Sequence, residues 1–315
     1  MEKKRVLLIA GGGTLGTYTA KELLRLGHAV EVICPEEKVS DNENLTYHRS
    51  LATEEFLRDL FSKNHYDGIV NFIHYPEVED YKKIHPLLIE NTDHLIFLSS
   101  YRVYADEVRP IVETAPRLID VSTDTVFLEE EKYAVSKARC EDYLYSECLG
   151  EPWTVVRPVI SFSTYRFDLY MYSNDDILDR AKAKKPVLLP HFAKDATAGV
   201  DWAGNSGKLI ANLLFKEGTI NERYTISSGQ NLTWGEVADI YSDLLGVSVE
   251  WVSEEAFVEN YPEAMGWKKW AYLYDRKFDR LIDNSKVLAA TGLTKGDFTP
   301  IRDGLAEELK KKGLI

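Results

Sequence analysis

The sequence predicts an α/β protein in which a doubly wound parallel sheet is joined to a smaller second domain. Two observations lead to this prediction. Short β-branched runs alternate with amphipathic stretches up to about residue 160, and beyond that point the pattern becomes irregular and richer in aromatic residues. A strand, a helix and a second strand in succession form a right-handed unit with parallel strands. Because such units place helices on both faces of the sheet, the strands are expected to be buried.

The predicted elements alternate in chain order. The first helix is expected to end at Gly27, since glycine commonly closes a helix in the left-handed conformation. The expected strands are RVLLIA (5–10), HAVEVIC (28–34), DGIVNFI (67–73), HLIFLSS (94–100) and WTVVRPVI (153–160). The expected helices are TLGTYTAKELLRLG (14–27), TEEFLRDLFSKN (53–64), YKKIHPLLIENT (81–92) and KYAVSKARCEDYLYSE (132–147).

Charge and composition limit the partners of this chain. Its 315 residues carry a formal net charge of −13, which repels phosphate backbones and anionic lipids, so we expect no nucleic-acid and no membrane-surface role. Three cysteines form no even framework and no C-x-x-C pair, which favours a reduced, cytoplasmic setting. The seven histidines show no metal-ligand spacing, so no metal is predicted. No run is typical of an export signal or a transmembrane helix.

A glycine-rich turn follows the first predicted strand. The stretch GGGTLG (11–16) has the spacing G-x-G-x-x-G between a strand and a helix, which predicts a dinucleotide site in a Rossmann-like fold. We expect Gly11 to permit the tight turn, Gly13 to let the backbone approach a pyrophosphate, and Gly16 to let helix and strand pack closely. The pyrophosphate would lie near the amides of Thr14 and Leu15. An ordinary glycine-rich turn is the alternative.

The domain boundaries follow from this motif and from the change in pattern. Residues 1–160 are predicted to form the dinucleotide-binding domain, with 196–228 returning to it because VDWAGNSGKLIANLL and RYTISS resume the strand and helix pattern. Residues 161–195 and 229–315 are predicted to form the smaller α/β substrate-binding domain.

The residues after the second strand bear on which dinucleotide is bound. An acidic residue there usually takes the ribose hydroxyls of NAD, whereas arginine favours NADP. Here Cys34 occupies the expected acidic position, and Glu36 and Glu37 follow it. Two carboxylates would repel a 2′-phosphate, which favours NAD with Glu36 at the ribose. Two alternatives stay open: solvated glutamates with no cofactor role, or NADP bound through Lys38 or Arg49.

A tyrosine and a lysine lie four residues apart in YAVSK (133–137). In a helix, residues i and i+4 share a face, so Tyr133 and Lys137 are expected to project into one site. A nearby ammonium stabilises a phenolate and lowers the pKa of the phenol from its usual value near 10, which makes a general acid/base. An exposed helix face is the alternative for this spacing alone. Ser100, in SSYRVY, adds a hydroxyl at the carboxyl edge of the sheet, and alternation should turn Ser99 the other way.

GGGTLG, SSYRVY and YAVSK in this order resemble the extended short-chain dehydrogenase/reductase family, the NAD-dependent epimerase/dehydratase group, over nearly the whole chain. The resemblance implies catalytic roles for Ser100, which would bind the reacting oxygen, for Tyr133 as acid/base, and for Lys137, which would also hold the nicotinamide ribose. It also implies that the following residues lie by the cofactor: Phe72, Ile73 and Val159.

The sequence departs from the family pattern at several places. Ala10 replaces a glycine, and TYHRSLA lacks an aspartate that contacts adenine in the family. Ser100 is followed by Tyr101 and Arg102 instead of Asp-Glu, which argues against dehydration and assigns this pair to the substrate. Tyr165 and Arg166 are predicted to clamp an anionic group; pairing of Arg166 with Asp168 is the alternative. Four aromatic residues either stack on a substrate or, as we favour, belong to the core: Trp267, Trp270, Tyr272 and Tyr274.

The resemblance therefore implies an enzyme. We expect an NAD-dependent oxidoreductase or epimerase that acts on a hydroxyl or carbonyl carbon of a small polar substrate, a nucleotide-sugar being one candidate. The alternatives are an NADP-dependent carbonyl reductase and a non-catalytic NAD(P)-binding sensor. All three catalytic positions are present, which favours the enzyme. A homodimer, common among relatives, is left open.

Overall fold

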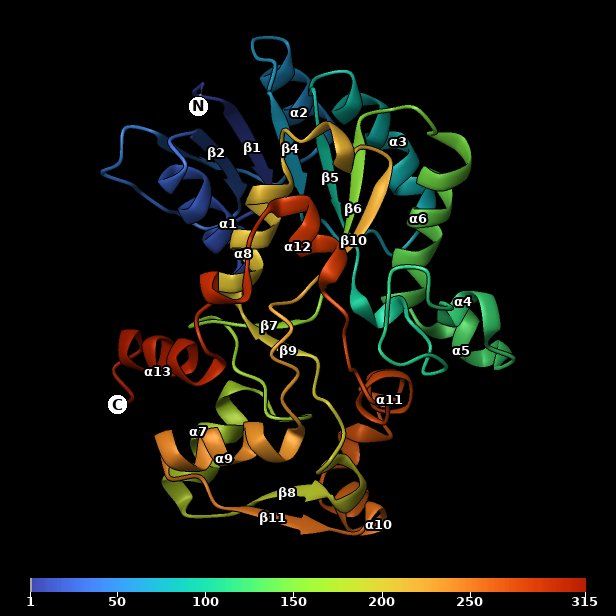
Figure 1. Ribbon diagram of the computed structural model, residues 1–315, viewed down its shortest axis with the longest axis vertical. Helices are drawn as coiled ribbons and strands as arrows, with labels where there is room; N and C mark the ends of the chain where they lie inside the picture. Colours follow the sequence, from blue (N-terminus) through green and yellow to red (C-terminus); the bar gives the residue numbers. More distant parts are fainter. Residues whose placement is uncertain (1) are drawn as a thin grey trace.

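The computed structural model describes residues 2–315 and has a large sheet unit above a smaller, more irregular part (Figure 1). The large sheet has seven parallel strands in the order β10-β6-β5-β4-β1-β2-β3, which confirms the predicted doubly wound sheet. Its direction of winding reverses between β1 and β4, where the ligand crevice of such folds lies. The strands are β1 (Arg5–Ile9), β2 (Ala29–Cys34), β3 (Leu45–Arg49), β4 (Gly68–Asn71), β5 (Leu95–Leu98), β6 (Trp153–Pro158) and β10 (Glu222–Ile226).

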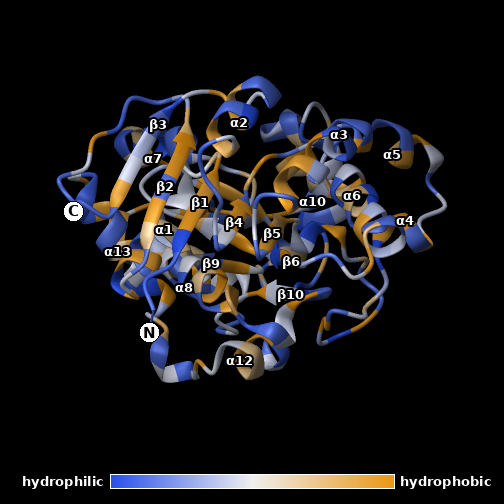
Figure 2. Ribbon diagram, turned by 90° about the horizontal axis from the view of Figure 1, so that it is seen from above, coloured by the Kyte–Doolittle hydropathy of each residue, from blue (hydrophilic) through white to orange (hydrophobic). Residues whose placement is uncertain are grey.

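Helices cover both faces of this sheet, and the apolar strands lie between them (Figure 2). One face carries α1 (Thr14–Arg25), α8 (Ala203–Leu213) and α12 (Ser285–Thr291). The other face carries α2 (Glu54–Phe61), α3 (Val78–Ile89) and α6 (Ala134–Glu147). Both core clusters contain sheet residues that are fully buried, as expected for strands that are covered on both sides.

The second half of the chain returns to the large sheet, within the predicted range 196–228. Strand β10 adds to the edge at β6, and α8 packs on α1. A Cβ on Gly207 would lie 2.6 Å from the amide nitrogen of Thr19, so glycine is needed for this close helix contact. Val287 and Phe298 also join the core on this face, so a later segment that includes α12 packs against the large unit as well.

The smaller part consists of two short sheets and several helices around an aromatic core. Parallel pairs are formed by β7 (Ile160–Phe162) with β9 (Val200–Trp202) and by β8 (Val187–Pro190) with β11 (Val249–Val252). The helices are α7 (Asn174–Ala183), α9 (Trp234–Leu245), α10 (Glu254–Asn260), α11 (Lys269–Ala271) and α13 (Ile301–Lys311). Two more helices, α4 (Leu118–Val121) and α5 (Thr125–Glu130), flank α6. None of the helices within residues 2–315 has the length and apolarity to cross a membrane.

Candidate active site

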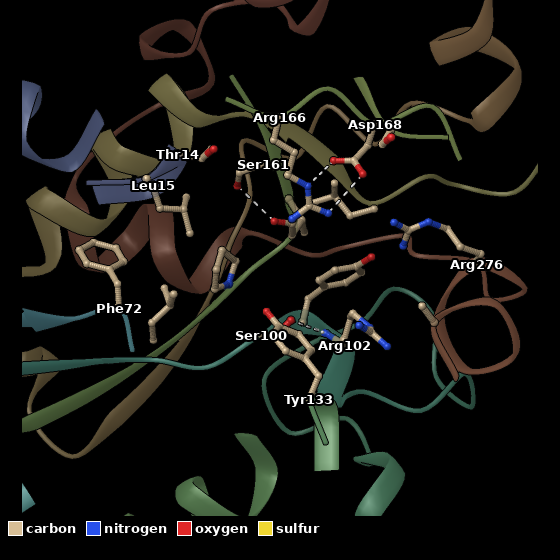
Figure 3. A pocket seen from close by; sticks show the side chains of 18 of the residues that line it. Thr14, Leu15, Phe72, Ser100, Arg102, Tyr133, Ser161, Arg166, Asp168 and Arg276 are labelled. Carbon is tan, nitrogen blue, oxygen red and sulfur yellow. Dashed lines mark hydrogen bonds and ion pairs between the residues drawn. The ribbon is translucent and has the colours of Figure 1, made fainter. Parts of the chain in front are cut away.

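A cavity of about 590 Å³ lies between the carboxyl edge of the large sheet and the smaller part (Figure 3). Its wall includes residues that directly follow β1, β4 and β6: Ala10, Phe72 and Val159. It brings together many of the predicted site residues, namely Gly13, Thr14, Leu15, Gly16, Phe72, Ser100, Tyr101, Arg102, Tyr133, Val159 and Arg166. Five predicted residues do not line it: Gly11, Glu36, Ile73, Lys137 and Tyr165. The volume lies within the usual range of small-molecule sites.

The glycine turn packs tightly except at one position. The residue with a left-handed conformation is Ala10, with φ of 56°, so the tight turn falls one residue before Gly11, where we expected it. Gly11 is needed for space instead, because a Cβ there would lie 2.7 Å from the Cβ of Leu8. A Cβ on Gly16 would collide with the backbone of Gly11, as the close-packing role requires. A Cβ on Gly13 would meet nothing within 4 Å, so the turn is open toward the cavity there.

Helix α1 begins at Thr14 beside this opening, and no side chain caps its first turn. A helix start with unsatisfied amides attracts an anion. The open position at Gly13 and the uncapped amides together fit the pyrophosphate of a dinucleotide, and both are observations of this turn rather than of its sequence.

Charged side chains lie against the outer side of the turn. A Cβ on Gly12 would lie 2.8 Å from Oε2 of Glu36, which places this carboxylate beside the turn. Lys38 donates a hydrogen bond from Nζ to the carbonyl of Gly12 and lies 3.4 Å from the hydroxyl of Tyr165. Tyr165 is 55% exposed and does not line the cavity. Arg49 pairs with Glu37 at 3.1 Å.

The ammonium of Lys137 is buried at the sheet edge. Its Nζ donates to the carbonyl of Ile73 at 3.0 Å and to the carbonyl of Leu98, which fixes it at the ends of β4 and β5. Burial lowers the pKa of Lys137 to about 8. Ile73 thus touches this site through its backbone, as the family pattern implied for the strand end.

Helix α6 starts two residues later than the predicted helix 132–147, and Tyr133 is its N-cap residue. The helix begins at Ala134, and the carbonyl of Tyr133 accepts the hydrogen bond from the amide of Lys137 at 2.9 Å. The reason is local: Oε2 of Glu131 accepts from the amides of Tyr133 and Val135 at 2.9 and 3.0 Å and so fixes the helix start there. Tyr133 and Lys137 therefore still lie one helical turn apart. The Tyr133 ring reaches the cavity (Figure 3).

Two neighbours flank the Tyr133 ring. The guanidinium of Arg102 lies 5.0 Å from the ring centroid, and the ring of His74 lies 5.1 Å away. The hydroxyl of Ser100 accepts from the amide of Arg102 at 3.2 Å, so its proton is free to be donated into the cavity. Ser99 is buried away from the cavity with no hydrogen-bond partner for its hydroxyl, which agrees with the strand alternation. Ser100, Arg102 and Tyr133 therefore form one wall (Figure 3).

The opposite wall comes from the smaller part of the chain. Arg166 lines the cavity and pairs with Asp168, which is the alternative given for it (Figure 3). Its binding of an anionic substrate group stays a prediction. Two lining cations, Lys268 and Arg276, were not predicted from the sequence. They lie in the segment MGWKKWAYLYDRKF (265–278), in no regular pattern that would select them. Other lining residues that were not predicted are Ser161, Asp168, Tyr170, Met171 and Ser173.

The four aromatic residues of that segment separate into two groups. Tyr272 is fully buried, and Trp270 and Tyr274 pack around Phe127, so the core interpretation describes these three. Trp267 is 80% exposed and lines the cavity. Only Trp267 of this set is therefore placed to contact a bound substrate.

Folding also brings together a group far from the cavity in the fold. Ligand atoms of His85, Cys148 and Glu151 lie within 4.8 Å of one another, a proximity that the sequence did not indicate. Both ring nitrogens of His85 already have partners: the Tyr81 hydroxyl at 3.0 Å and Glu151 at 2.6 Å. A hydrogen-bonded histidine and carboxylate account for this group without an ion.

Comparison with known proteins gives the same fold. No family model and no curated protein matches the sequence. Among solved structures, UDP-glucuronic acid 4-epimerase from Bacillus cereus, in complex with UDP-glucuronic acid and NAD, is similar with a TM-score of 0.70 and 14% identity, covering 99% of this chain and 100% of that one. The Bordetella bronchiseptica enzyme WbmG, in complex with NAD and UDP, has a TM-score of 0.71 and 17% identity, covering 99% and 97%.

The ADP-L-glycero-D-manno-heptose-6-epimerase of Helicobacter pylori is similar as well, with a TM-score of 0.69 and 14% identity over 100% of this chain and 97% of that one. These likenesses span both parts of the molecule. They show that the chain has the same fold as these three proteins over nearly its whole length.

Proposed function

We propose that the protein is an NAD-dependent enzyme of the extended short-chain dehydrogenase/reductase type that oxidises or reduces a hydroxyl-bearing carbon, as an epimerase or an oxidoreductase. The observation that carries this proposal is the meeting of the open glycine turn, Ser100 and Tyr133 on one cavity, with the Lys137 ammonium behind them. Each of these groups comes from a different strand end or helix start, so a random surface pattern would not bring them together.

The chain has the groups that would hold the cofactor. The amides of Thr14 and Leu15 at the start of α1 would take the pyrophosphate, and Gly13 leaves room for it. Phe72 and Val159, at the sheet edge, would lie along the rest of the dinucleotide. When bound, the nicotinamide supplies a site that accepts or donates a hydride.

Charge near the ribose supports NAD over NADP. Glu36 lies beside the turn, where its carboxylate would accept from ribose hydroxyls and repel a 2′-phosphate. The two cations that were candidates for binding such a phosphate are engaged: Lys38 with the Gly12 carbonyl, and Arg49 with Glu37.

The proton chemistry rests on three side chains. Ser100 would donate a hydrogen bond from its hydroxyl to the reacting oxygen of the substrate. This hydrogen bond would hold the oxygen near Tyr133. Tyr133 would move the proton to or from that oxygen, and the charge of Lys137 would stabilise the phenolate. No acid pair follows Ser100, so the chain lacks an obvious second base for elimination of water. The similar structures with bound UDP or UDP-glucuronic acid support a nucleotide-sugar as one substrate class.

The nucleotide bound by the purified protein tests this proposal. We expect acid release to yield NAD, identified by mass, or titration of nucleotide-free protein to show tighter binding of NAD than of NADP. NAD that stays bound through turnover supports an epimerase, and NAD that exchanges supports net oxidation or reduction. Absence of affinity for either nucleotide would contradict the proposed function.

A further inference from the structure

Positive charge predominates on the cavity wall, although the chain as a whole is acidic. The lining cations are Arg102, Arg166, Lys268 and Arg276, and Asp168 is the lining carboxylate. Asp168 is already paired with Arg166. The cations that face the cavity beside Tyr133 are therefore not neutralised by acids of the same wall.

The acids behind this wall are too few to balance it. Asp275 is shared by three guanidiniums: it pairs with Arg276, accepts from Nε of Arg280 at 3.2 Å, and lies 3.8 Å from Nε of Arg102. Burial raises the pKa of Asp275, but the neighbouring arginines hold it below its ordinary value, so it is a carboxylate. Glu131 adds a second negative charge, which leaves three arginines against two acids.

Arg102 is the arginine with the weakest compensation. Its contact with Glu131 is 3.3 Å long, because the other oxygen of that carboxylate is taken by the two helix amides. Its Nε is buried and has no hydrogen-bond partner. The charge of Arg102, which lines the cavity, is therefore only partly balanced by Glu131 and Asp275.

The position of Arg102 decides which part of a substrate it meets. Its amide binds Ser100, and its guanidinium lies over the Tyr133 ring (Figure 3). A substrate whose reacting oxygen lies between Ser100 and Tyr133 therefore presents its reacting end, and not its distal end, to Arg102.

We propose that Arg102 binds an anionic group, a carboxylate or a phosphate, carried by the reacting end of the substrate close to the carbon that is oxidised or reduced. This inference rests on the proposed function for the placement of the reacting oxygen. It makes Arg102 the residue that selects acidic over neutral substrates. Lys268 and Arg276 also line the cavity, where Lys268 donates to the carbonyl of Met171 and Arg276 pairs with Asp275.

Matched probe pairs test the proposal by calorimetric titration of the whole protein, with and without saturating NAD. UDP-glucuronic acid and UDP-glucose differ by a carboxylate, as do glucuronate and glucose, and glucose 6-phosphate tests the phosphate. In at least one pair, the wild type should bind the member with the anionic sugar about tenfold or more tighter than the member with the neutral sugar. This is the size expected for a charge-assisted hydrogen bond. The pair that shows the preference identifies the anion.

Two variants assign that preference to one side chain. Arg102→Gln should abolish the preference by weakening the binding of the anionic probe far more than that of its partner. Arg102→Lys should keep part of the preference because the charge remains without the planar fork. Arg109→Gln is the control, since Arg109 pairs with Asp106 and Asp279 outside the cavity. Thermal unfolding of each variant checks that it is folded.

The outcomes separate this inference from the proposed function. Failure to bind NAD contradicts the proposed function, whereas the preference measured without NAD still tests Arg102. Equal binding of acidic and neutral members in all pairs overturns the inference, and so does a preference that survives in Arg102→Gln. Arg102→Gln could instead shift the pH profile of turnover equally for both kinds of substrate and leave the preference intact. That result would make Arg102 a positioning residue for Tyr133 and would also overturn the inference.

Discussion

The two walls of the cavity differ in how the chain builds them. One wall, which we call the cofactor wall, lies at strand ends and helix starts of the large parallel sheet and includes Gly13, Ser100 and Tyr133. The other, which we call the substrate wall, consists of irregular segments, including a single turn of π-helix at Tyr272–Arg276 and a short helix α11. A regular sheet edge fixes chemistry by topology, whereas the opposite wall depends on side-chain packing that is particular to this chain.

The largest expected effect is on the cofactor wall. Tyr133→Phe removes the hydroxyl that moves the proton but keeps the ring under the Arg102 guanidinium. We expect turnover to fall by about 10²–10⁴-fold, since this is the usual contribution of general acid/base catalysis. NAD binding should be unchanged. Turnover with an identified substrate and NAD titration check both points.

A matched control comes from the same helix. Tyr143 lies on α6 with its ring against Tyr81, outside the cavity, so Tyr143→Phe should retain turnover. Full activity of Tyr133→Phe on the true substrate would remove Tyr133 from the mechanism.

The second prediction compares two aromatic residues of the substrate wall. Tyr272 is fully buried and packs against Phe257, so Tyr272→Ala should lower the free energy of unfolding by about 3–5 kcal/mol, as for other large aromatic residues in cores. Trp267 is mostly exposed, so Trp267→Ala should change stability by less than about 0.5 kcal/mol. Denaturant unfolding measures both.

Binding should show the opposite order. Because Trp267 lines the cavity, Trp267→Ala should weaken the binding of a nucleotide-sugar probe, whereas any Tyr272→Ala protein that is folded should bind it. Equal binding by wild type and Trp267→Ala would show that the substrate wall acts without this ring.

The extent of sequence prediction follows the same division. Ser100 and Gly13 were predicted from the end of a strand and from the glycine spacing, and Tyr133 from its spacing to Lys137 and the family resemblance; all three line the cavity. The left-handed conformation of Ala10 was not predicted, because an alanine in the sequence does not indicate a positive φ. The positions of Lys268 and Arg276 on the cavity were not predicted, because no periodicity distinguishes them from the other residues of a basic and aromatic segment. Whether a charged residue faces a cavity there is decided by its acid partners, which lie elsewhere in the sequence, as Asp168 does for Arg166.

The third prediction concerns pH and the cofactor wall. Burial places the pKa of Lys137 at about 8, so its ammonium is charged below that pH and loses its charge as the pH rises through it. If this charge supports proton transfer at the proposed site, kcat/KM should fall above pH 8 by up to about tenfold per pH unit. Lys137→Arg keeps a positive charge over this range, so its profile should lack this alkaline decline even if the rate is lower. An identical decline in both proteins would assign it to another group.

The smallest expected effect concerns the preference for NAD over NADP and a residue outside the cavity. Glu36 lies beside the turn without lining the cavity, and its carboxylate should favour the free ribose hydroxyls of NAD over the 2′-phosphate of NADP. Glu36→Gln removes the charge but keeps the shape, so the ratio of NADP to NAD affinity should rise about severalfold, the size of one exposed charge interaction. Glu37→Gln is the matched control, because Glu37 is exposed and pairs with Arg49. If both variants shift the ratio equally, the preference comes from the general acidity of this loop and not from the place of Glu36 against Gly12.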